Sequence, residues 1–494
     1  MRLKKKVSRG HSARAASVDV HCHVFNSWDV PVRQFIKLVY LEKFPGGHLA
    51  DSLVDFLELI MRFDAPTTGE EIDELKGARF SLNRLKPHGT NDHNLRAVAH
   101  ALEQMWNRSS ENREWVQQQL RNHWRKPRIS LTPAHFKRAA QYLMGRKGFD
   151  LFTWIKFALI YTKPRWEITE QLVSLSATQE KEVVLYTPAM LDIGFPLNQG
   201  DTSDLREQVK LMSLISQMKG WNCAVHAFVA FDPFRSKSDP TVLDTVMNAV
   251  QSKGAIGVKI YPPMGFKPCG NYDSELNRQM KRFLDFCLNK DVPIMAHCCF
   301  SQFVTPTQGA CAAPEAWHTF LKDHKALRLN LGHCGGPWDI DPNQLTSTIW
   351  TKTVIELLGC GDYPNLYADV ADDSFILEPG SARNRTMMKK LRGFLNANAY
   401  AKTRLLYGSD WSLLARESGT SKYYERMKTD FCQGRYGLDF TDDQTRGFLG
   451  GNALRFLGLA KNPNGSKPKN RVRLENFRSK NGLDMSIFSK VDAQ

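Results

Sequence analysis

The stretch from residue 255 to residue 298 decides the fold, because it holds two strands and the helix between them. It reads "AIGVKIYP" (255–262), then "SELNRQMKRFLDFCLNK" (274–290), then "VPIMAHC" (292–298). The outer segments are short apolar runs rich in β-branched residues, which is typical of buried strands. In the middle segment apolar residues recur at a helical period and form one stripe, namely Leu276, Met280, Phe283, Leu284 and Cys287. Strand, helix and strand in this order predict a parallel βαβ unit.

The same pattern of strand and helix recurs along most of the chain. Five further strand candidates lie after residue 182: "VVLYTPAM" (183–190), "CAVHAFVAF" (223–231), "LRLNLGHC" (327–334), "NLYADVAD" (365–372) and "RLLYGSDW" (404–411). The segment "SVDVHCHVF" (17–25) adds an eighth strand at the start. An open sheet of this size would need a switch point, and no nucleotide fingerprint marks one. The sequence therefore predicts an α/β fold, a (β/α)₈ TIM barrel.

A long insertion separates the first strand from the second. We expect the barrel to comprise residues 17–26 and 165–460, and residues 27–164 to form a helical insertion. A segment that leaves the C-terminal end of a barrel strand lies over the active-site face. The insertion is therefore interpreted as a cap that shapes the substrate pocket, and an oligomerisation appendage is the alternative.

The net charge of +16 is concentrated at the two ends of the chain. Residues 1–17 carry six Lys or Arg and no acidic residue, while residues 461–494 carry eight basic and three acidic residues, so these ends supply 11 of the 16 charges. Basic ends of this kind are usually solvated and disordered, and no nucleic-acid-binding motif lies between them. We expect basic tails at residues 1–16 and 461–494, and no specific nucleic-acid partner.

Several features indicate a cytoplasmic protein. No apolar run approaches the length of a membrane helix, and the basic N-terminus lacks the apolar segment of a secretory signal. The ten cysteines are scattered and do not form a disulfide framework, which favours a reducing compartment. We expect a small-molecule substrate and no membrane partner, and a homo-oligomer is compatible with the sequence.

Five polar residues that can bind a metal stand at or near the ends of predicted strands. His21 and His23 end the first strand, and side chains at positions i and i+2 of a strand point the same way. His297 ends the fifth strand, His333 the sixth and Asp410 the eighth. In a barrel these ends meet at one mouth. Imidazoles and a carboxylate suit one divalent ion, Zn²⁺ in the first place, with Mn²⁺, Fe²⁺ or Co²⁺ also compatible.

The ordered motifs resemble a known enzyme family. "DVHCH", "IMAHC", "LNLGHCGG" and "LLYGSDW", followed by "FLGGNALRFLGL", look like the amidohydrolase superfamily. The resemblance is closest to its amidohydrolase-related branch, which contains metal-dependent hydrolases and decarboxylases related to aminocarboxymuconate-semialdehyde decarboxylase. It covers residues 17–26 and about 165–460 and implies that His21, His23, His297 and Asp410 bind a single metal. It also implies that Asp410 acts as the catalytic base and that His333 contacts the substrate.

Other residues near the predicted mouth have roles that the resemblance leaves open. Lys259 either bridges to a second metal, in which case His333 would be its ligand, or meets a substrate carboxylate; a second ion is not expected. Tyr261, Trp338 and Trp411 are candidates for the substrate pocket. Cys22, Cys298 and Cys334 adjoin the histidines, but strand alternation turns them to the opposite face, where a buried apolar role is expected. His226 is expected to be structural.

The resemblance implies a metal-dependent hydrolase that uses metal-activated water. We expect it to cleave a C–N or C–O bond, in an amide, a lactone or a similar group, of a small carboxylate-bearing molecule. A nonoxidative, metal-dependent decarboxylase of an aromatic or unsaturated acid is the alternative. A non-catalytic binding protein built on a degenerate barrel is a third hypothesis, and the intact set of ligands argues against it.

Overall fold

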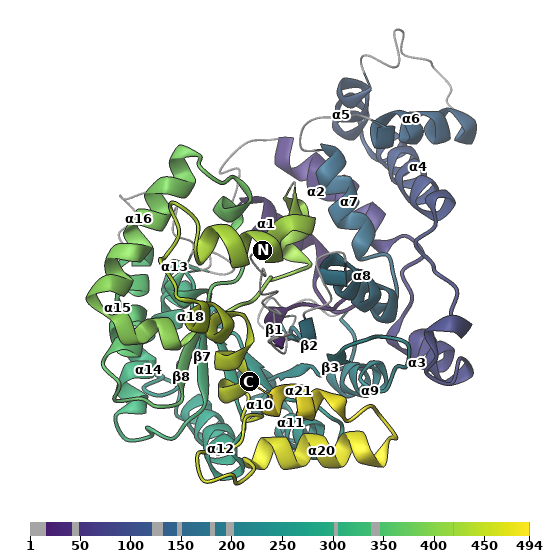
Figure 1. The fold of residues 1–494 in the computed structure, drawn as a ribbon. Coiled ribbons are helices and arrows are strands. Elements are labelled where there is room, and N and C mark those ends of the chain that lie inside the picture. The colour runs from purple at the N-terminus through teal and green to yellow at the C-terminus, as the bar shows by residue number, and fades with distance from the viewer. Residues whose placement is uncertain are drawn as a thin grey trace, which may run out of the picture.

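Nine short, parallel strands of the described residues form the centre of the molecule (Figure 1). The computed structural model describes residues 16–41, 49–120, 132–145, 151–177, 183–193, 202–300, 305–336, 346–417 and 419–493. The strands are β1 (Ser17–Cys22), β2 (Val183–Pro188), β3 (Ala224–Val225), β4 (Phe228–Ala230), β5 (Gly257–Ile260), β6 (Ile294–His297), β7 (Leu329–Gly332), β8 (Leu366–Asp369) and β9 (Leu405–Leu406). Since β3 and β4 lie in the one predicted segment 223–231, every predicted strand is present.

The strands follow one another around the barrel in sequence order, and the α/β barrel architecture is confirmed. The strand-to-strand hydrogen bonds do not form one closed ring. They divide the strands into two sheets, β1-β2-β3 and β4-β5-β6-β7-β8-β9. The third predicted strand divides at His226 and Ala227, which separates the two sheets there. An isolated parallel bridge between Ala189 and Phe228 spans this gap. At the other gap the amide of Val20 donates to the carbonyl of Tyr407, at 3.2 Å.

Helices alternate with these strands, as the sequence predicts. They are α8 (Arg165–Ala177), α9 (Leu205–Ile215), α10 (Pro233–Ser238), α11 (Thr241–Ser252), α12 (Ser274–Lys290), α13 (Pro306–Gly309), α14 (Pro314–Leu321), α15 (Thr346–Gly359), α16 (Ala382–Ala397), α17 (Tyr423–Arg426), α18 (Asp442–Arg446) and α19 (Asn452–Phe456). The side chain of Asp273 caps α12 by accepting the amides of Glu275 and Leu276. The predicted stripe of α12 is buried. Among the described residues, none of these helices or the others is long and apolar enough to cross a membrane.

The segment between β1 and α8 is helical. Its helices are α1 (Val32–Leu41), α2 (Leu49–Arg62), α3 (Thr68–Gly77), α4 (Asn91–Arg108), α5 (Ser110–Gln119), α6 (Pro133–Gly145) and α7 (Leu151–Ile160). Near its end, the hydroxyl groups of Tyr161 and Ser412 form a hydrogen bond of 2.8 Å. The insertion therefore contacts the chain just beyond β9, close to Asp410.

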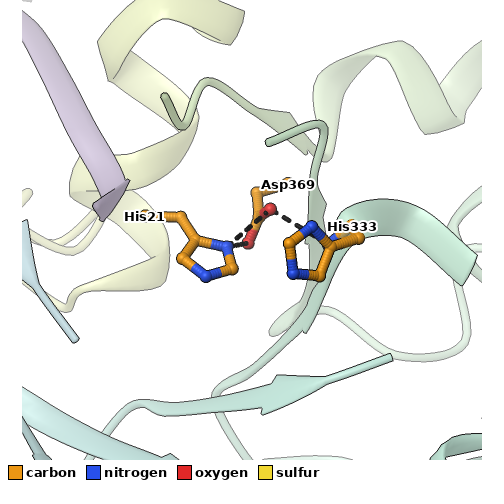
Figure 2. A group of neighbouring side chains, drawn as sticks. All are labelled: His21, His333 and Asp369. Carbon is orange, nitrogen blue, oxygen red and sulfur yellow. Dashed lines mark hydrogen bonds and ion pairs between the residues drawn. The ribbon is translucent and has the colours of Figure 1, made fainter. Parts of the chain in front are cut away.

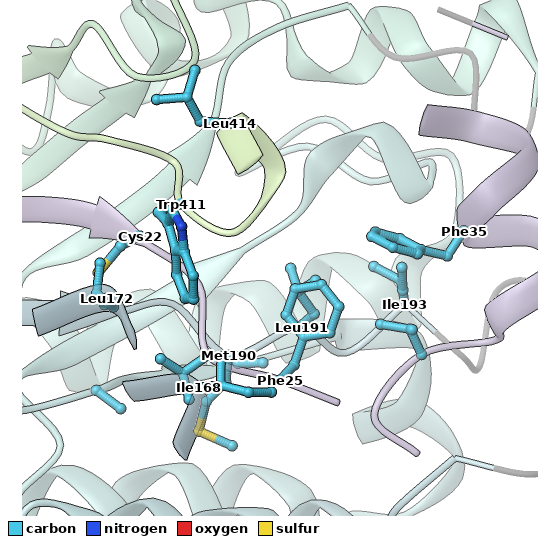
Figure 3. Packing of buried hydrophobic residues seen from close by; sticks show 14 of the residues in the cluster. Cys22, Phe25, Phe35, Ile168, Leu172, Met190, Leu191, Ile193, Trp411 and Leu414 are labelled. Carbon is cyan, nitrogen blue, oxygen red and sulfur yellow. The ribbon is translucent and has the colours of Figure 1, made fainter. Parts of the chain in front are cut away.

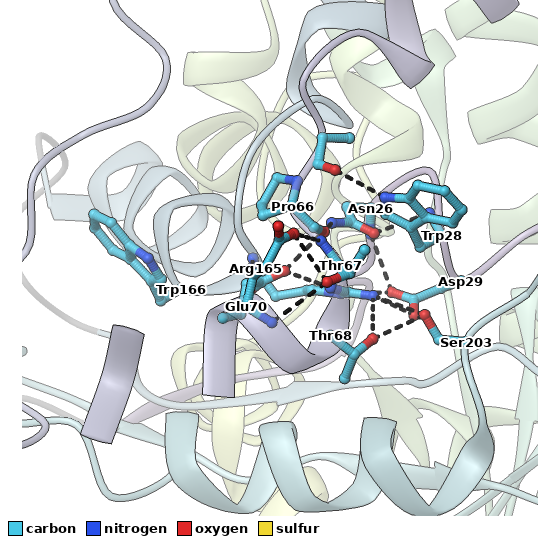
Figure 4. Close-up of polar contacts among 12 residues, drawn as sticks. Asn26, Trp28, Asp29, Pro66, Thr67, Thr68, Glu70, Arg165, Trp166 and Ser203 are labelled. Atoms are coloured by element: carbon cyan, nitrogen blue, oxygen red, sulfur yellow. Dashed lines mark hydrogen bonds and ion pairs between the residues drawn. The ribbon is translucent and has the colours of Figure 1, made fainter. Parts of the chain in front are cut away.

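A buried polar network joins this insertion to the barrel (Figure 4). Arg165, which is 1% exposed, donates from Nε and Nη2 to both oxygens of Asp29, at 2.9 and 2.6 Å. Its backbone amide and its Nη1 donate to the carboxylate of Glu71 on α3. The Nδ2 of Asn26, beyond β1, donates to the carbonyl of Pro66 at 2.8 Å. One cation thus links the chain after β1, helix α3 and the start of α8.

The C-terminal segment differs from the solvated tail that its charge predicts. Residues 461–494 contain α20 (Lys469–Lys480) and α21 (Ser486–Asp492), which lie along the lower side of the view in Figure 1. Apolar side chains from this segment belong to the same buried cluster as barrel residues such as Val184 and Met295, and they are Leu474, Ile487, Phe488 and Val491. The Nδ2 of Asn470 also donates to the carbonyl of Ile256, at 2.8 Å. The charge count overlooked these apolar residues, which are spaced among the basic ones.

Candidate metal centre

The five polar residues predicted at the strand ends lie together at one mouth of the barrel. His21 lies in β1, His297 ends β6, His333 follows β7, and His23 and Asp410 lie just beyond β1 and β9. The ring centroids of His21 and His23 are 5.4 Å apart, and those of His21 and His333 are 4.8 Å apart. The ring of His297 lies 4.7 Å from that of His333. Residues separated by almost 400 positions therefore form one cluster.

Two histidines and one carboxylate form the most compact part of this cluster. Oδ1 of Asp410 lies 3.0 Å from Nε2 of His23 and 4.0 Å from Nε2 of His21. These three side chains can each offer a ligand atom within 4.8 Å of the others, and all three are buried. Ligand atoms around a tetrahedral Zn²⁺ at ~2.0–2.1 Å are separated by about 3.3 Å. The distances of 3.0 and 4.0 Å between the candidate ligand atoms are therefore close to the separation expected around a bound divalent ion.

The backbone holds this group in place. The amide of Asp410 donates to the carbonyl of His21 at 2.7 Å, and the amide of His23 donates to the carbonyl of Trp411. A Cβ added to Gly408 would lie 2.7 Å from Cβ of His21, so only glycine permits this approach. Asp410 and His333 both have left-handed backbone conformations, with φ of 50° and 61°. Such conformations persist where the surroundings enforce them and are frequent at functional sites.

Three histidines of the cluster have an acceptor at Nδ1, so that Nε2 is the nitrogen that faces the centre of the cluster. The Nδ1 of His23 lies 2.8 Å from the carbonyl of Ala189, and the Nδ1 of His333 lies 3.2 Å from the carbonyl of Ala371. Since a carbonyl only accepts, these nitrogens carry the proton and donate it. The Nδ1 of His21 donates in the same way to Asp369. Fixing the tautomer through Nδ1 is how proteins aim Nε2 at a metal.

Asp369, the last residue of β8, belongs to the site and was missed from the sequence (Figure 2). Both of its oxygens lie 3.0 Å from Nδ1 of His21. It also accepts from Nδ2 of Asn330 at 2.6 Å and from the amide of His333 at 3.0 Å. With its oxygens so occupied, Asp369 orients His21 and the start of the His333 turn. The signal was present, because Asp369 ends the strand predicted in "NLYADVAD".

Burial and neighbouring charges set the protonation of the site. Burial lowers the pKa of His21 to about 4 and also lowers the pKa of His297 well below its ordinary value. Burial alone would raise the pKa of Asp410, but the contact with His23 outweighs it and keeps the pKa low. The pKa of Asp369 is likewise held low by His21 against the effect of burial. Neutral imidazoles and ionised carboxylates are the forms that bind a divalent cation.

Two buried atoms of the cluster lack a hydrogen bond. Nε2 of His297 has no hydrogen-bond partner among the residues that the structure describes, and Oδ1 of Asp410 has no regular hydrogen bond there, only the 3.0 Å contact with Nε2 of His23. Buried polar atoms are normally satisfied, and an exception calls for an explanation such as an ion. The donor set, nitrogen and carboxylate oxygen, fits Zn²⁺ and related ions. His297 lies beside His333, outside the compact group of His21, His23 and Asp410.

Lys259 and Tyr261 lie against this cluster. Nζ of Lys259, on β5, lies 3.2 Å from Nε2 of His21, and burial lowers the pKa of Lys259 to about 8. The ring of Tyr261 lies 4.2 Å from that of His297, centroid to centroid. Both predicted residues therefore lie at the same mouth, and their roles toward a substrate remain predictions.

The two tryptophans predicted for the pocket have different outcomes. Trp338 lies outside the described residues. Trp411 is 3% exposed and packs beside Cys22, Leu172 and Leu414 in the apolar core (Figure 3). The prediction for Trp411 is therefore wrong. It follows Asp410 directly, but its side chain packs behind the strands, against α8.

The cysteines next to the histidines take no part in the site. Cys22, Cys298 and Cys334 are fully buried and belong to the main hydrophobic core. The groups of the described chain that could hold a metal contain only histidine and aspartate. His226 is structural, as predicted, because its Nδ1 donates to the carbonyl of Gly254 at 2.9 Å and its Nε2 accepts from Arg478 at 2.9 Å.

Comparisons with known proteins place these features in a family. Residues 225–459 match the model of the amidohydrolase family. This match confirms the resemblance to the amidohydrolase-related branch, and it includes His297, His333, Asp369 and Asp410. No curated protein matches the chain.

Solved structures with similarity to the chain come from several bacteria. A probable 2-pyrone-4,6-dicarboxylic acid hydrolase from Acinetobacter baumannii, with citric acid bound, is 11% identical, with a TM-score of 0.39 over 58% of this chain and 88% of that chain. An amidohydrolase from Burkholderia multivorans with bound zinc is 13% identical, with a TM-score of 0.38 over 58% and 87%. A dihydroxybenzoic acid decarboxylase from a Polaromonas species, with manganese and the inhibitor 2-nitroresorcinol, is 14% identical, with a TM-score of 0.39 over 63% and 91%.

Proposed function

We propose that this chain, whose residues 225–459 match the amidohydrolase family model, hydrolyses a C–N or C–O bond in a small molecule that bears a carboxylate. The bond would lie in an amide, a lactone or a similar group. The observation that supports the proposal is the buried group of His21, His23 and Asp410, in which Oδ1 of Asp410 lies 3.0 Å from Nε2 of His23 and 4.0 Å from Nε2 of His21. The same match supports an enzyme of the metal-dependent amidohydrolase type over a non-catalytic binding protein.

The residues that would hold the ion are His21, His23, Asp410 and His297. We propose one Zn²⁺, because two or three imidazoles with one carboxylate form a donor set that zinc favours, and Mn²⁺, Fe²⁺ and Co²⁺ compete for the same donors. When bound, such an ion polarises the bond to be cleaved and lowers the pKa of water beside it.

Asp410 is proposed as the base. Its contact with His23 keeps its pKa low, so that it is ionised at neutral pH and ready to take a proton from water. The same carboxyl group then returns the proton to the leaving nitrogen or oxygen. Two backbone hydrogen bonds hold Asp410 beside His21 and His23. The amide of Asp410 donates to the carbonyl of His21, and the carbonyl of Trp411 accepts from the amide of His23.

Lys259 and His333 are proposed to hold the substrate. Lys259 is 2% exposed, and at a pKa of about 8 its ammonium group is mostly charged at pH 7. A buried cation next to His21 would attract a substrate carboxylate. The ring of His333, fixed at Nδ1 by the carbonyl of Ala371, lies between His21 and His297, where it can contact the attacked group.

The test compares metal-depleted enzyme with enzyme reloaded with Zn²⁺ on a panel of amides, lactones and aromatic acids that bear a carboxylate. Formation of a new carboxylic acid is followed in a pH-stat, and CO₂ release is followed in parallel. We expect zinc-dependent acid formation, and at least a ~100-fold loss in Asp410→Asn, the low end of what a positioned base contributes.

Asp285→Asn, on the exposed side of α12, provides the matched control and should retain full activity. Turnover that survives both metal removal and Asp410→Asn would refute the proposed site. Zinc-dependent CO₂ release without acid formation would keep the site but replace hydrolysis by decarboxylation, the alternative reaction.

A further inference from the structure

A pocket lies at the opposite end of the barrel from the histidine cluster. It is formed by the N-terminal ends of β2 and β3, the loop before β3, and the turn between α20 and α21. Its volume is about 280 Å³, which is close to the lower end of the usual range for small-ligand pockets. The proposed hydrolase makes no use of this pocket.

Arg478, on the wall of this pocket, carries a buried charge that is offset only through space, by the carboxylate of the exposed residue Asp484. Its side chain is 5% exposed, and it donates only to neutral acceptors, the carbonyl of Asp484 and Nε2 of His226. His226 is neutral, because its Nδ1 donates to Gly254 while its Nε2 accepts from Arg478. Among the described residues, no carboxylate lies within ion-pair distance of Arg478. A buried guanidinium in this state is costly unless an anion joins it.

Two lysines add to the positive charge of the pocket. Lys219 and Lys490 line it, and neither side chain has a hydrogen bond or ion pair within the described part of the chain. The carboxylate in the lining, that of Asp484, is engaged with the amide and hydroxyl of Ser486. Nε1 of Trp221, also in the lining, is a buried donor without a hydrogen-bond partner in the described structure. Three cations and one carboxylate leave a net charge of about two positive units at this pocket.

From this balance we propose that the pocket binds a small dianion, inorganic phosphate or a phosphate monoester. A guanidinium with unused N–H groups matches a tetrahedral oxyanion, and two flexible ammonium groups can close on the remaining oxygens. A dianion cancels the excess charge, whereas a metal cation would add to it.

The experiment titrates inorganic phosphate into the zinc-loaded enzyme at constant ionic strength and records heat and melting temperature. Wild type should bind one phosphate at this pocket and should melt at a higher temperature in its presence. Because both lysines are exposed, Lys219→Gln with Lys490→Gln should fold normally and bind phosphate at least ~10-fold more weakly, as expected for losing two charge-assisted contacts. Lys390→Gln, on α16 at the other side of the molecule, makes a control of the same chemistry (Figure 1).

The outcomes separate this pocket from the metal centre. Phosphate that binds the double variant as tightly as wild type is held at the metal centre or elsewhere, and this overturns the proposal, as does the absence of saturable binding to wild type. Tighter binding of citrate than of phosphate would overturn the assignment of a phosphate group. Arg478→Lys keeps the charge and removes the planar fork, so that it should weaken phosphate binding even where the protein remains folded. The readout is binding, so failure here leaves the proposed hydrolysis untouched.

Discussion

Replacing Asp369 by Asn tests whether this buried carboxylate orients the metal centre. The substitution keeps the shape of the side chain but turns one acceptor oxygen into an NH₂ donor. In the native protein both oxygens face donors, namely Nδ1 of His21, Nδ2 of Asn330 and the amide of His333. At least one donor must then face another donor, and His21 loses a charged partner.

The magnitude follows from these contacts. One lost charge-assisted hydrogen bond, with a buried donor left unsatisfied, destabilises the folded protein by about 3 kcal/mol. Loss of the carboxylate that fixes the tautomer of a ligand histidine lowers metal affinity by ~10–100-fold, equivalent to about 1.4–2.7 kcal/mol. We therefore expect Asp369→Asn to lower both the free energy of unfolding and the affinity for Zn²⁺.

Urea unfolding of the metal-free protein gives the first quantity, and competition with a chelator of known zinc affinity gives the second. Asp362→Asn, an exposed carboxylate shortly before β8, is the matched control and should leave both unchanged. If Asp369→Asn binds Zn²⁺ as tightly as wild type, then Asp369 does not orient His21, whatever happens to stability.

Three further predictions concern the regions around the site. Arg165→Met should destabilise the fold by about 3–5 kcal/mol in urea unfolding, because it leaves Asp29 and Glu71 buried without their cation; the exposed pair variant Arg278→Met should cost less than about 1 kcal/mol, and equal costs would contradict the role of the network. Phe488→Ala should cost about 3–5 kcal/mol, since Phe488 packs in the cluster beneath the barrel, and no change would mean that the C-terminal segment is solvated after all. Burial and the charge of Arg478 lower the pKa of His226 to about 3; the unfolded histidine, with an ordinary pKa near 6.5, takes up a proton first as the pH falls, so this residue alone should remove about 2 kcal/mol of stability between pH 7 and pH 5. His226→Gln should remove that part of the pH dependence, whereas His318→Gln should not, and identical pH profiles for wild type and His226→Gln would show that His226 is not held neutral.

The order of the barrel strands could be predicted because each strand is a short apolar run between polar breaks. The ligands at the strand ends followed from the same periodicity, since His21, His23, His297, His333 and Asp410 close such runs. The periodicity does not show which side chains on different strands contact each other. Asp369 stands at the end of its strand, much as Asp410 stands beyond the end of β9. Its hydrogen-bond partner His21 lies 348 positions away in the sequence, so the pattern within one strand could not reveal the contact.

The errors have physical reasons as well. Trp411 follows a site residue in sequence, but the left-handed backbone at Asp410 turns the chain there, and the indole packs in the core beside Leu172 of α8 (Figure 3). The C-terminal segment has a basic composition, yet four apolar residues among its charges are enough to dock two helices under the barrel. Net charge describes how a segment interacts with solvent and carries no information about such spacing.

X-ray absorption at the zinc edge tests the metal centre most directly. Zinc-loaded enzyme should show one ion per chain with imidazole nitrogen and carboxylate oxygen at ~2.0–2.2 Å, and both the ion and this signature should be lost together in His23→Gln and Asp410→Asn. Sulfur at ~2.3 Å would instead place the ion on a cysteine such as Cys22 or Cys298, and that spectrum, or zinc that stays bound in both variants, would contradict the site described above.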